Sequence, residues 1–141
     1  AREVGEGGRQ ACAAALAALD VLQEEQVPRH AAGAERLIGH RLDRWRDQYV
    51  EGVVETSSRG ILAGVRLRDT TLAAMVRERA LAHGLLVRID GAASEEGWIG
   101  IRPPLLVTRT ELERGLDSLD RAFSDVFDTG RSSLHAATRA T

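Results

Sequence analysis

The chain has 141 residues and a mass of 15.3 kDa, with 43% hydrophobic and 28% charged residues, which suits one globular domain with a single core. Its 19 basic and 21 acidic residues leave a net charge of −2, too small for a long-range field that would hold nucleic acid or an anionic membrane. All the basic residues are arginine, so the chain contains no lysine. Its one cysteine, Cys12, excludes an internal disulfide and every multi-cysteine metal site.

The sequence contains neither a membrane segment nor a secretory signal that we can identify. No apolar run is long enough to cross a bilayer, and the first residues lack the charged, apolar and small-residue order of a signal peptide. We therefore expect a cytoplasmic protein. Residues 1–10, which include three glycines, are expected to form a flexible lead-in.

Two helices are expected in the first third of the chain. Residues 10–26 are dense in alanine and nearly free of polar side chains before Asp20, so we expect a helix buried around most of its circumference, with an inert, buried thiol at Cys12. Pro28 is expected to end it. Apolar residues at spacings of four, three and four predict a second helix over residues 30–49, namely Ile38, Leu42, Trp45 and Tyr49.

The middle of the chain predicts strands and a third helix. Residues 53–54 and the alternating segment 61–67 predict two short strands around a turn at 57–60. Asp69 offers an N-cap for a helix that runs to about His83 and ends at Gly84. Two further strands are expected after it, at residues 85–89 and 98–102, on either side of a loop at 90–97.

The last third predicts the clearest helix of the chain. Thr108 stands three residues before Glu111, which is the form of a capping box. Behind it apolar residues repeat at spacings of four and three, namely Leu112, Leu116, Leu119, Phe123 and Val126. From residue 128 onward there is little to bury, and we expect a frayed tail over residues 128–141. The order α-α-β-β-α-β-β-α predicts an α+β fold in which short, mostly antiparallel strands are covered by helices.

Histidines and helix arginines do not by themselves predict a site. The four histidines show no HExxH motif and no carboxylate at a ligand-like spacing, so no metal site is expected. The arginines of the second helix alternate with Asp43 and Asp47, which predicts a solvated face laced with ion pairs, formed by Arg41, Arg44 and Arg46.

Arg102 is the candidate binding residue. It ends the strand at 98–102, the prolines at 103 and 104 hold it rigidly, and its planar guanidinium suits a carboxylate. Trp98, Gly100 and Arg102 share one face of the strand. The alternative is that Arg102 pairs with a structural acid such as Glu95 or Glu96 in the preceding loop, and the sequence leaves both open.

Four segments, collinear in order and spacing, resemble class III (ornithine-aminotransferase-like) pyridoxal-phosphate enzymes. Residues 11–22, ACAAALAALDVL, resemble the long helix after the family's cofactor loop. Residues 59–67, RGILAGVRL, look like its RGLMLGVEL strand, and residues 80–87 like its helix-to-strand step. Residues 101–108, IRPPLLVT, with Glu111 and Leu112, are similar to its PPL-x-[IV]-T-x-x-E-[IL] ending.

This resemblance covers residues 11 to about 127 and implies the C-terminal small domain of a fold-type-I aminotransferase, with the helix that connects it to the large domain. Such an enzyme is a homodimer with active sites between its subunits, and it moves an amino group between an amine or amino acid and a keto acid. Its pyridoxal phosphate is held by a lysine of the large domain. Because this chain has no lysine, we expect it to need a large domain or partner chain, to hold no catalytic residue and to be inactive alone.

The chain departs from the family pattern at three places. Val4 stands where a threonine contacts the cofactor phosphate across the dimer, and Ser57–Ser58 replace an Arg-Gly pair. Gly100 stands where an arginine usually grips the substrate carboxylate, three residues before the first proline. Arg102 matches a second arginine found in members that read R-x-R-P-P-L, so the resemblance makes it a candidate substrate-binding residue.

Two rival functions remain at this stage. The chain could be a non-catalytic α+β module, derived from such an enzyme, that binds a partner chain or small ligand. A helical DNA-binding domain is the weaker rival, because the net charge is close to neutral. If the chain is part of an aminotransferase or such a non-catalytic module, the apolar helix at 10–26 predicts association with another chain, through Leu16, Leu19 and Leu22.

Overall fold

The computed structural model describes residues 8–90 and 97–138 of the chain, with side chains described as far as Asp128. Four helices and four strands follow one another in the predicted order. They are α1 (Arg9–Glu24), α2 (Val27–Gln48), β1 (Val53–Arg59), β2 (Leu62–Leu67), α3 (Thr70–Ala82), β3 (Arg88–Asp90), β4 (Gly97–Ile101) and α4 (Arg109–Thr138). The predicted α+β class is confirmed.

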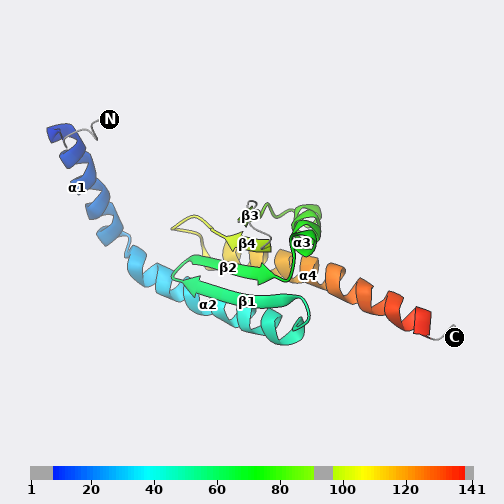
Figure 1. Ribbon diagram of the computed structural model, residues 1–141. Coiled ribbons are helices and arrows are strands. Elements are labelled where there is room, and N and C mark those ends of the chain that lie inside the picture. The colour runs from blue at the N-terminus through cyan, green and yellow to red at the C-terminus, as the bar shows by residue number, and fades with distance from the viewer. Residues whose placement is uncertain (1–7, 91–96, 139–141) are drawn as a thin grey trace, which may run out of the picture.

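The four strands form one antiparallel sheet with the order β1-β2-β4-β3. Val65 of β2 lies opposite Thr56 of β1 and Ile99 of β4, and Val65 and Ile99 are fully buried. The side chains of this face pack against α2, α3 and α4, and Figure 1 shows β1 and β2 in front of α2 and α4. The core therefore lies between one face of the sheet and three helices.

Helices α2 and α4 are joined by a column of aromatic rings. Trp45 stacks on Phe123 with ring centroids 4.8 Å apart, and Tyr49 stacks on Phe127 at the same distance. Tyr49 and Phe123 also stack, at 5.7 Å. Stacked rings of this kind add to the free energy of area burial. All five apolar residues predicted for the last helix are buried, which confirms its amphipathic pattern.

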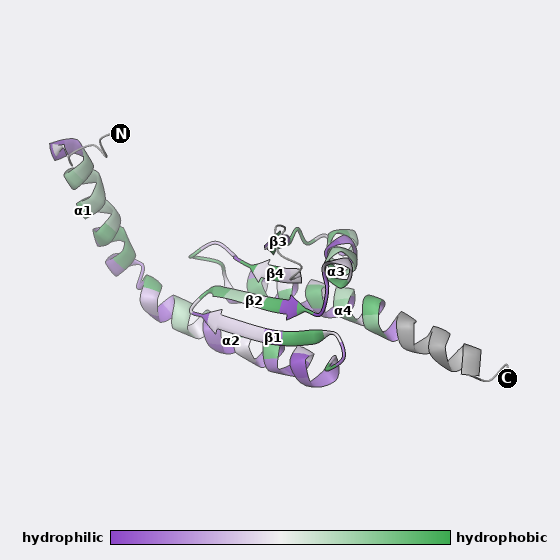
Figure 2. Ribbon diagram, in the orientation of Figure 1, coloured by the Kyte–Doolittle hydropathy of each residue, from purple (hydrophilic) through white to green (hydrophobic). Residues whose placement is uncertain are grey.

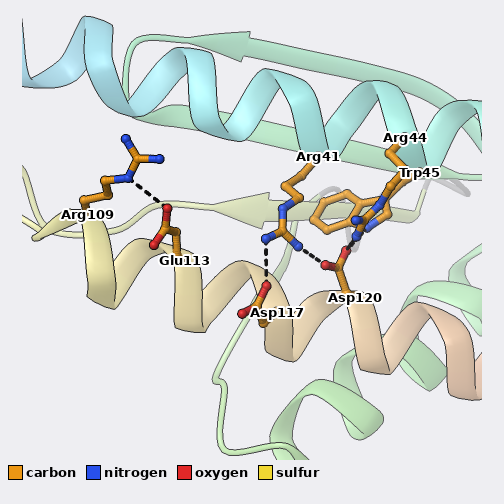
Figure 3. A network of polar contacts seen from close by, with 7 residues as sticks. All are labelled: Arg41, Arg44, Trp45, Arg109, Glu113, Asp117 and Asp120. Carbon is orange, nitrogen blue, oxygen red and sulfur yellow. Dashed lines mark hydrogen bonds and ion pairs between the residues drawn. The ribbon is translucent and has the colours of Figure 1, made fainter.

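A polar network lies beside these rings and ties α2 to α4 (Figure 3). Arg41 donates one hydrogen bond to Asp117, at 2.7 Å, and another to Asp120. Asp120 also pairs with Arg44 and accepts a hydrogen bond of 2.6 Å from the indole Nε1 of Trp45. The hydrogen bond that Arg44 donates to Asp120 raises the pKa of Arg44 above its ordinary value, since it stabilises the charged guanidinium.

This network corrects part of the sequence-based expectation. Arg46 pairs with Asp43 and Asp47 along the helix surface, as a solvated face would require. Arg41 and Arg44 instead cross to α4, because both point toward its acidic residues. The basic residues of α2 are thus partly an interhelical clamp.

The predicted helix caps are present. The Asp69 carboxylate accepts a hydrogen bond of 2.8 Å from the amide of Leu72. At the start of α4 the Thr108 hydroxyl accepts from the Glu111 amide, and the Glu111 carboxylate accepts from the Thr108 amide at 2.9 Å, which is the reciprocal capping box. Hydrogen bonds from Thr108 to the Glu111 side chain lower the pKa of this carboxyl.

Helix α1 contradicts the expectation of burial. It has no buried residue, and Leu16 and Leu19 are 62% and 54% exposed. Cys12, expected to be buried, is exposed as well. Figure 1 shows the reason: α1 extends away from the sheet and meets only the beginning of α2. Figure 2 shows that most residues of α1 are hydrophobic, and none of them is buried by the described residues.

Several element boundaries differ from those expected. Pro28 lies in the first turn of α2, where its missing amide hydrogen costs nothing, and Gln26 makes the break with a positive φ of 49°. The hairpin turn falls at Gly60 and Ile61, because Gly60 takes a φ of 60°, so Ser57–Ser58 belong to β1. Helix α4 continues to Thr138 where a frayed tail was expected from residue 128, since an established helix adds residues at little cost.

Candidate functional site

The face of the sheet opposite the core carries the candidate site. Trp98, Gly100 and Arg102 point to this face, as the alternation along β4 requires. Gly64 of β2 and Gly100 of β4 lie directly opposite each other in the register. The Trp98 ring covers Gly64, since a Cβ at that residue would approach the ring to 3.1 Å. The centre of the face is therefore low and flat.

Arg102 forms an ion pair with Asp90, the last residue of β3. Its Nη2 donates to the Asp90 Oδ2 at 2.6 Å. The other oxygen of this carboxylate, Oδ1, lies 3.4 Å from the Nε of Arg88. The sequence left open whether Arg102 binds a ligand carboxylate or pairs with a structural acid such as Glu95 or Glu96. The structure gives Arg102 a structural acid, and that acid is Asp90. Glu95 and Glu96 lie outside the described residues.

Gly100 makes room for this ion pair. A Cβ built on Gly100 would lie 2.7 Å from the Asp90 Oδ2 and 3.5 Å from the Arg102 Nε. The pair therefore crosses directly over the Gly100 backbone, in the space that a side chain would fill. Position 100 cannot carry a larger residue unless Asp90 moves.

A small cavity of about 300 Å³ adjoins Arg102. Residues 85–87, the strand end at 100–104 and the first turns of α4 line it, and most of these are apolar. Arg102 and Glu111 are its charged residues. Arg102 is half exposed, with 53% of its side chain accessible, and it lies where the open face meets this cavity. It can therefore reach a ligand carboxylate as well as Asp90.

A larger, open concavity of about 720 Å³ lies between the first half of α2 and the start of α4. Arg29, Arg36 and Arg109 contribute to its wall, together with His30 and His40. The His30 Nε2 lies 2.7 Å from the carbonyl oxygen of Val107, which joins α2 to the segment before α4. Arg109 also pairs with Glu113 within α4 (Figure 3).

The remaining candidate residues are scattered. His83 pairs with Asp125 at 2.8 Å, and Cys12 belongs to α1, which extends away from the sheet (Figure 1). Val4 lies outside the described residues. No group of three metal-ligating side chains occurs within residues 8–90 and 97–128. In the same part of the chain no helix is both long and apolar enough to span a bilayer.

Sequence comparison places residues 6–123 under a family model described as aminotransferase class-III. An ornithine aminotransferase of Geobacillus is 29% identical over 120 residues, which are 85% of this chain and 28% of that protein. An omega-aminotransferase of Caulobacter vibrioides is 29% identical over 82% of this chain and 26% of its own length. A leucine/methionine racemase of Thermococcus litoralis is 30% identical over 85% of this chain and 28% of that protein. The chain thus spans little more than a quarter of these relatives.

Solved structures show the same fold. A lysine aminotransferase from M. tuberculosis superposes with a TM-score of 0.67 at 19% identity, over 77% of this chain and 24% of that one. A structure described as a transaminase with L-Ala gives a TM-score of 0.70 at 22% identity, over 88% of this chain and 29% of that one. These likenesses establish the architecture, which forms 24% and 29% of those two chains.

Proposed function

Because the chain belongs to the class III aminotransferase family, we propose that it is the C-terminal part of a pyridoxal-phosphate-dependent enzyme that moves an amino group between an amine or amino acid and a keto acid. The family match over residues 6–123 is the observation that carries this proposal. The fold supports it, since the sheet and helices superpose on aminotransferases over most of this chain.

The residues of this chain do not fit the covalent attachment of pyridoxal phosphate. The cofactor supplies the electron sink of such enzymes and is held there by a lysine, and this sequence contains none. We therefore assign the catalytic lysine to a large domain outside these residues, and we assign no catalytic residue to this chain. Residues 8–138 contribute binding and packing surfaces.

Arg102 is the residue that we propose for substrate binding. Its guanidinium lies on the open face of the sheet beside an apolar cavity, and only one of its five N–H donors is directed at Asp90. A planar fork of this kind binds a carboxylate with two parallel hydrogen bonds. The substrate class that follows is an amino acid or keto acid that carries a carboxylate at this end.

Helix α1 is proposed to be the contact with the rest of the enzyme. Its leucines at 16, 19 and 22 are exposed, and contiguous apolar surface of this kind marks an interface. The partner is the large domain or a second copy of the chain, as in a homo-oligomer. The cytoplasmic location expected from the sequence stays a prediction.

The test uses the complete polypeptide that contains this chain. Loaded with pyridoxal phosphate and reduced with borohydride, it should carry the cofactor on a lysine outside the 141 residues, located by mass spectrometry of its peptides. It should also transfer an amino group from an amine or amino acid to a keto acid. A complete protein that neither retains the cofactor nor transfers the group, yet binds a partner chain, would support the non-catalytic module instead.

The isolated 141-residue chain is the control. With the α-amino group of Ala1 blocked, it should form no adduct that borohydride makes permanent, because no side-chain amine is present. A stable adduct on the blocked chain would overturn the assignment of the lysine to another domain.

A further inference from the structure

We propose that Arg88, Asp90 and Arg102 form a carboxylate-binding cluster in which Asp90 occupies the site until a ligand carboxylate replaces it. Asp90 and Gly100 then determine how strongly the site prefers a ligand with a carboxylate over a neutral one. The identification of that ligand as a substrate rests on the proposed aminotransferase function; the binding itself does not.

The charge of the cluster favours an anion. Two guanidinium groups share one carboxylate, with Asp90 Oδ2 at 2.6 Å from Arg102 and Oδ1 at 3.4 Å from Arg88. The described part of the cluster therefore carries one unbalanced positive charge. Each arginine has five N–H donors, and Asp90 engages one on each side. The unused N–H groups can donate hydrogen bonds to a second carboxylate.

Exposure makes the cluster accessible. The side chains of Arg88 and Arg102 are 77% and 53% exposed, whereas that of Asp90 is 28% exposed. The cations therefore face the solvent, and the resident carboxylate lies beneath them. A ligand carboxylate can reach Arg102 without first opening the core of the domain.

The backbone fixes where the three groups meet. In the pairing of β3 with β4, Arg88 lies opposite Gly100 and Asp90 opposite Trp98. Arg102 follows two residues after Gly100 on the same face. All three side chains thus converge over Gly100, which has no side chain, and Pro103 and Pro104 restrict the backbone immediately behind Arg102.

Gly100 is what allows Asp90 to act as the resident anion. With a Cβ at position 100, the distance to the Asp90 Oδ2 would be 2.7 Å, so even alanine forces the carboxylate out of its place. The glycine thus permits an internal competitor for Arg102. Ligands without a carboxylate leave this competitor undisturbed, whereas ligands with one must displace it or share the guanidinium.

The test is a titration of the 141-residue chain with propionate and with propionamide, which have the same size and differ in charge. Binding is followed at constant ionic strength by NMR signals of the arginine Nε–H groups. Propionate should shift the signals of Arg102 and Arg88, and propionamide should not. Arg102→Gln should weaken propionate binding by about tenfold or more, because it removes the charged fork.

The Asp90→Asn variant shows whether Asp90 competes with a ligand carboxylate for Arg102 or helps Arg102 to bind it. If Asp90 competes, its neutral isostere should tighten propionate binding by about two- to fivefold, the scale of a partly exposed ion pair. Gly100→Ala should act in the same direction, since it displaces the carboxylate without removing it. Unchanged or weaker binding in Asp90→Asn would overturn the proposal, and so would equal shifts with propionamide.

Arg59→Gln is the matched control. Arg59 is exposed and lies opposite Leu62 on the edge strand β1, which β2 separates from β4, so its loss should leave propionate binding unchanged. A loss equal to that of Arg102→Gln would mean nonspecific binding to arginine and would also overturn the proposal. Circular dichroism of each variant verifies that the fold is retained.

The two proposals fail separately. If the complete protein transfers no amino group while propionate binding follows the expected pattern, the aminotransferase function is wrong and the cluster stands. If transfer occurs while Asp90→Asn and Arg102→Gln leave propionate binding unchanged, the function stands and the cluster is wrong.

Discussion

Helices α1 and α4 are both rich in apolar residues, yet α4 is packed into the core and α1 is exposed. Helix α4 buries Leu112, Leu116, Leu119, Phe123 and Val126, whereas α1 buries none of its residues. In α4 the apolar positions follow the helical period and face the core that α4 shares with α2 and α3. In α1 most positions are also apolar, but Leu16, Leu19 and Leu22 stay exposed. Apolar content therefore shows that a helix needs a partner, but it does not show whether that partner is its own domain.

The first prediction tests the α4 side of this comparison. Phe123→Ala should lower the free energy of unfolding by about 3–5 kcal/mol, because it empties the centre of the aromatic column between α2 and α4. Urea denaturation of the 141-residue chain measures the change. A loss below about 1 kcal/mol would mean that the column contributes little to the core.

The second prediction concerns the polar network beside that column. Asp120→Ala should cost about 2–3 kcal/mol, since it leaves Arg41, Arg44 and the Trp45 indole without their shared acceptor. Asp43→Ala is the matched control, because Asp43 pairs with Arg46 on the exposed surface of α2. Its loss should stay within about 0.5 kcal/mol, and equal losses in the two variants would contradict the interhelical clamp.

The third prediction concerns the start of α4. Thr108→Ala should cost about 1 kcal/mol of unfolding free energy, because it removes the hydroxyl that caps the Glu111 amide. The wild-type capping box should also depend on pH. Since folding lowers the pKa of Glu111, its contribution is present above the ordinary value of 4.5 and is lost as the pH falls through the lowered value.

Measurements of unfolding at pH 7 and at acidic pH verify this sign. The difference between wild type and Glu111→Gln should be larger at pH 7 and should shrink in acid. A difference that grows as the pH falls would contradict the assignment.

The smallest effect on stability is expected in α1. Leu19→Ser should change the unfolding free energy of the isolated chain by less than about 0.5 kcal/mol, because Leu19 is exposed. The same change should weaken association of the chain, measured by sedimentation at increasing concentration. A wild-type chain that stays monomeric at high concentration, alone and with the rest of the enzyme, would contradict the interface.

The sequence predicted most of the packed domain and less of its exposed parts. Strict helical spacing predicted α4, and the capping residues Asp69 and Thr108 predicted two helix starts, because these signals are local. Burial of α1 was wrongly predicted, since composition carries no information on what lies beside a helix. The partner of Arg102 was missed for a related reason: Asp90 meets it through strand register, which depends on the whole sheet.

A stronger interpretation of Gly100 could have located part of the site. A glycine within a strand signals a close approach by another group. Which group approaches became visible only with the pairing of β3 and β4, which sets Asp90 beside Trp98 and its carboxylate over Gly100. The ion pairs from Arg41 and Arg44 to α4 depend in the same way on how two distant helices pack.

The central claim is that α1 is completed by a surface outside this chain. Hydrogen exchange of the α1 amides, compared between the dilute 141-residue chain and the complete protein, tests it most directly. In the dilute chain α1 should exchange rapidly while residues 112–126 of α4 stay protected, because a short helix without tertiary contacts opens readily. In the complete protein α1 should become as well protected as α4. Rapid exchange of α1 in both would contradict the claim.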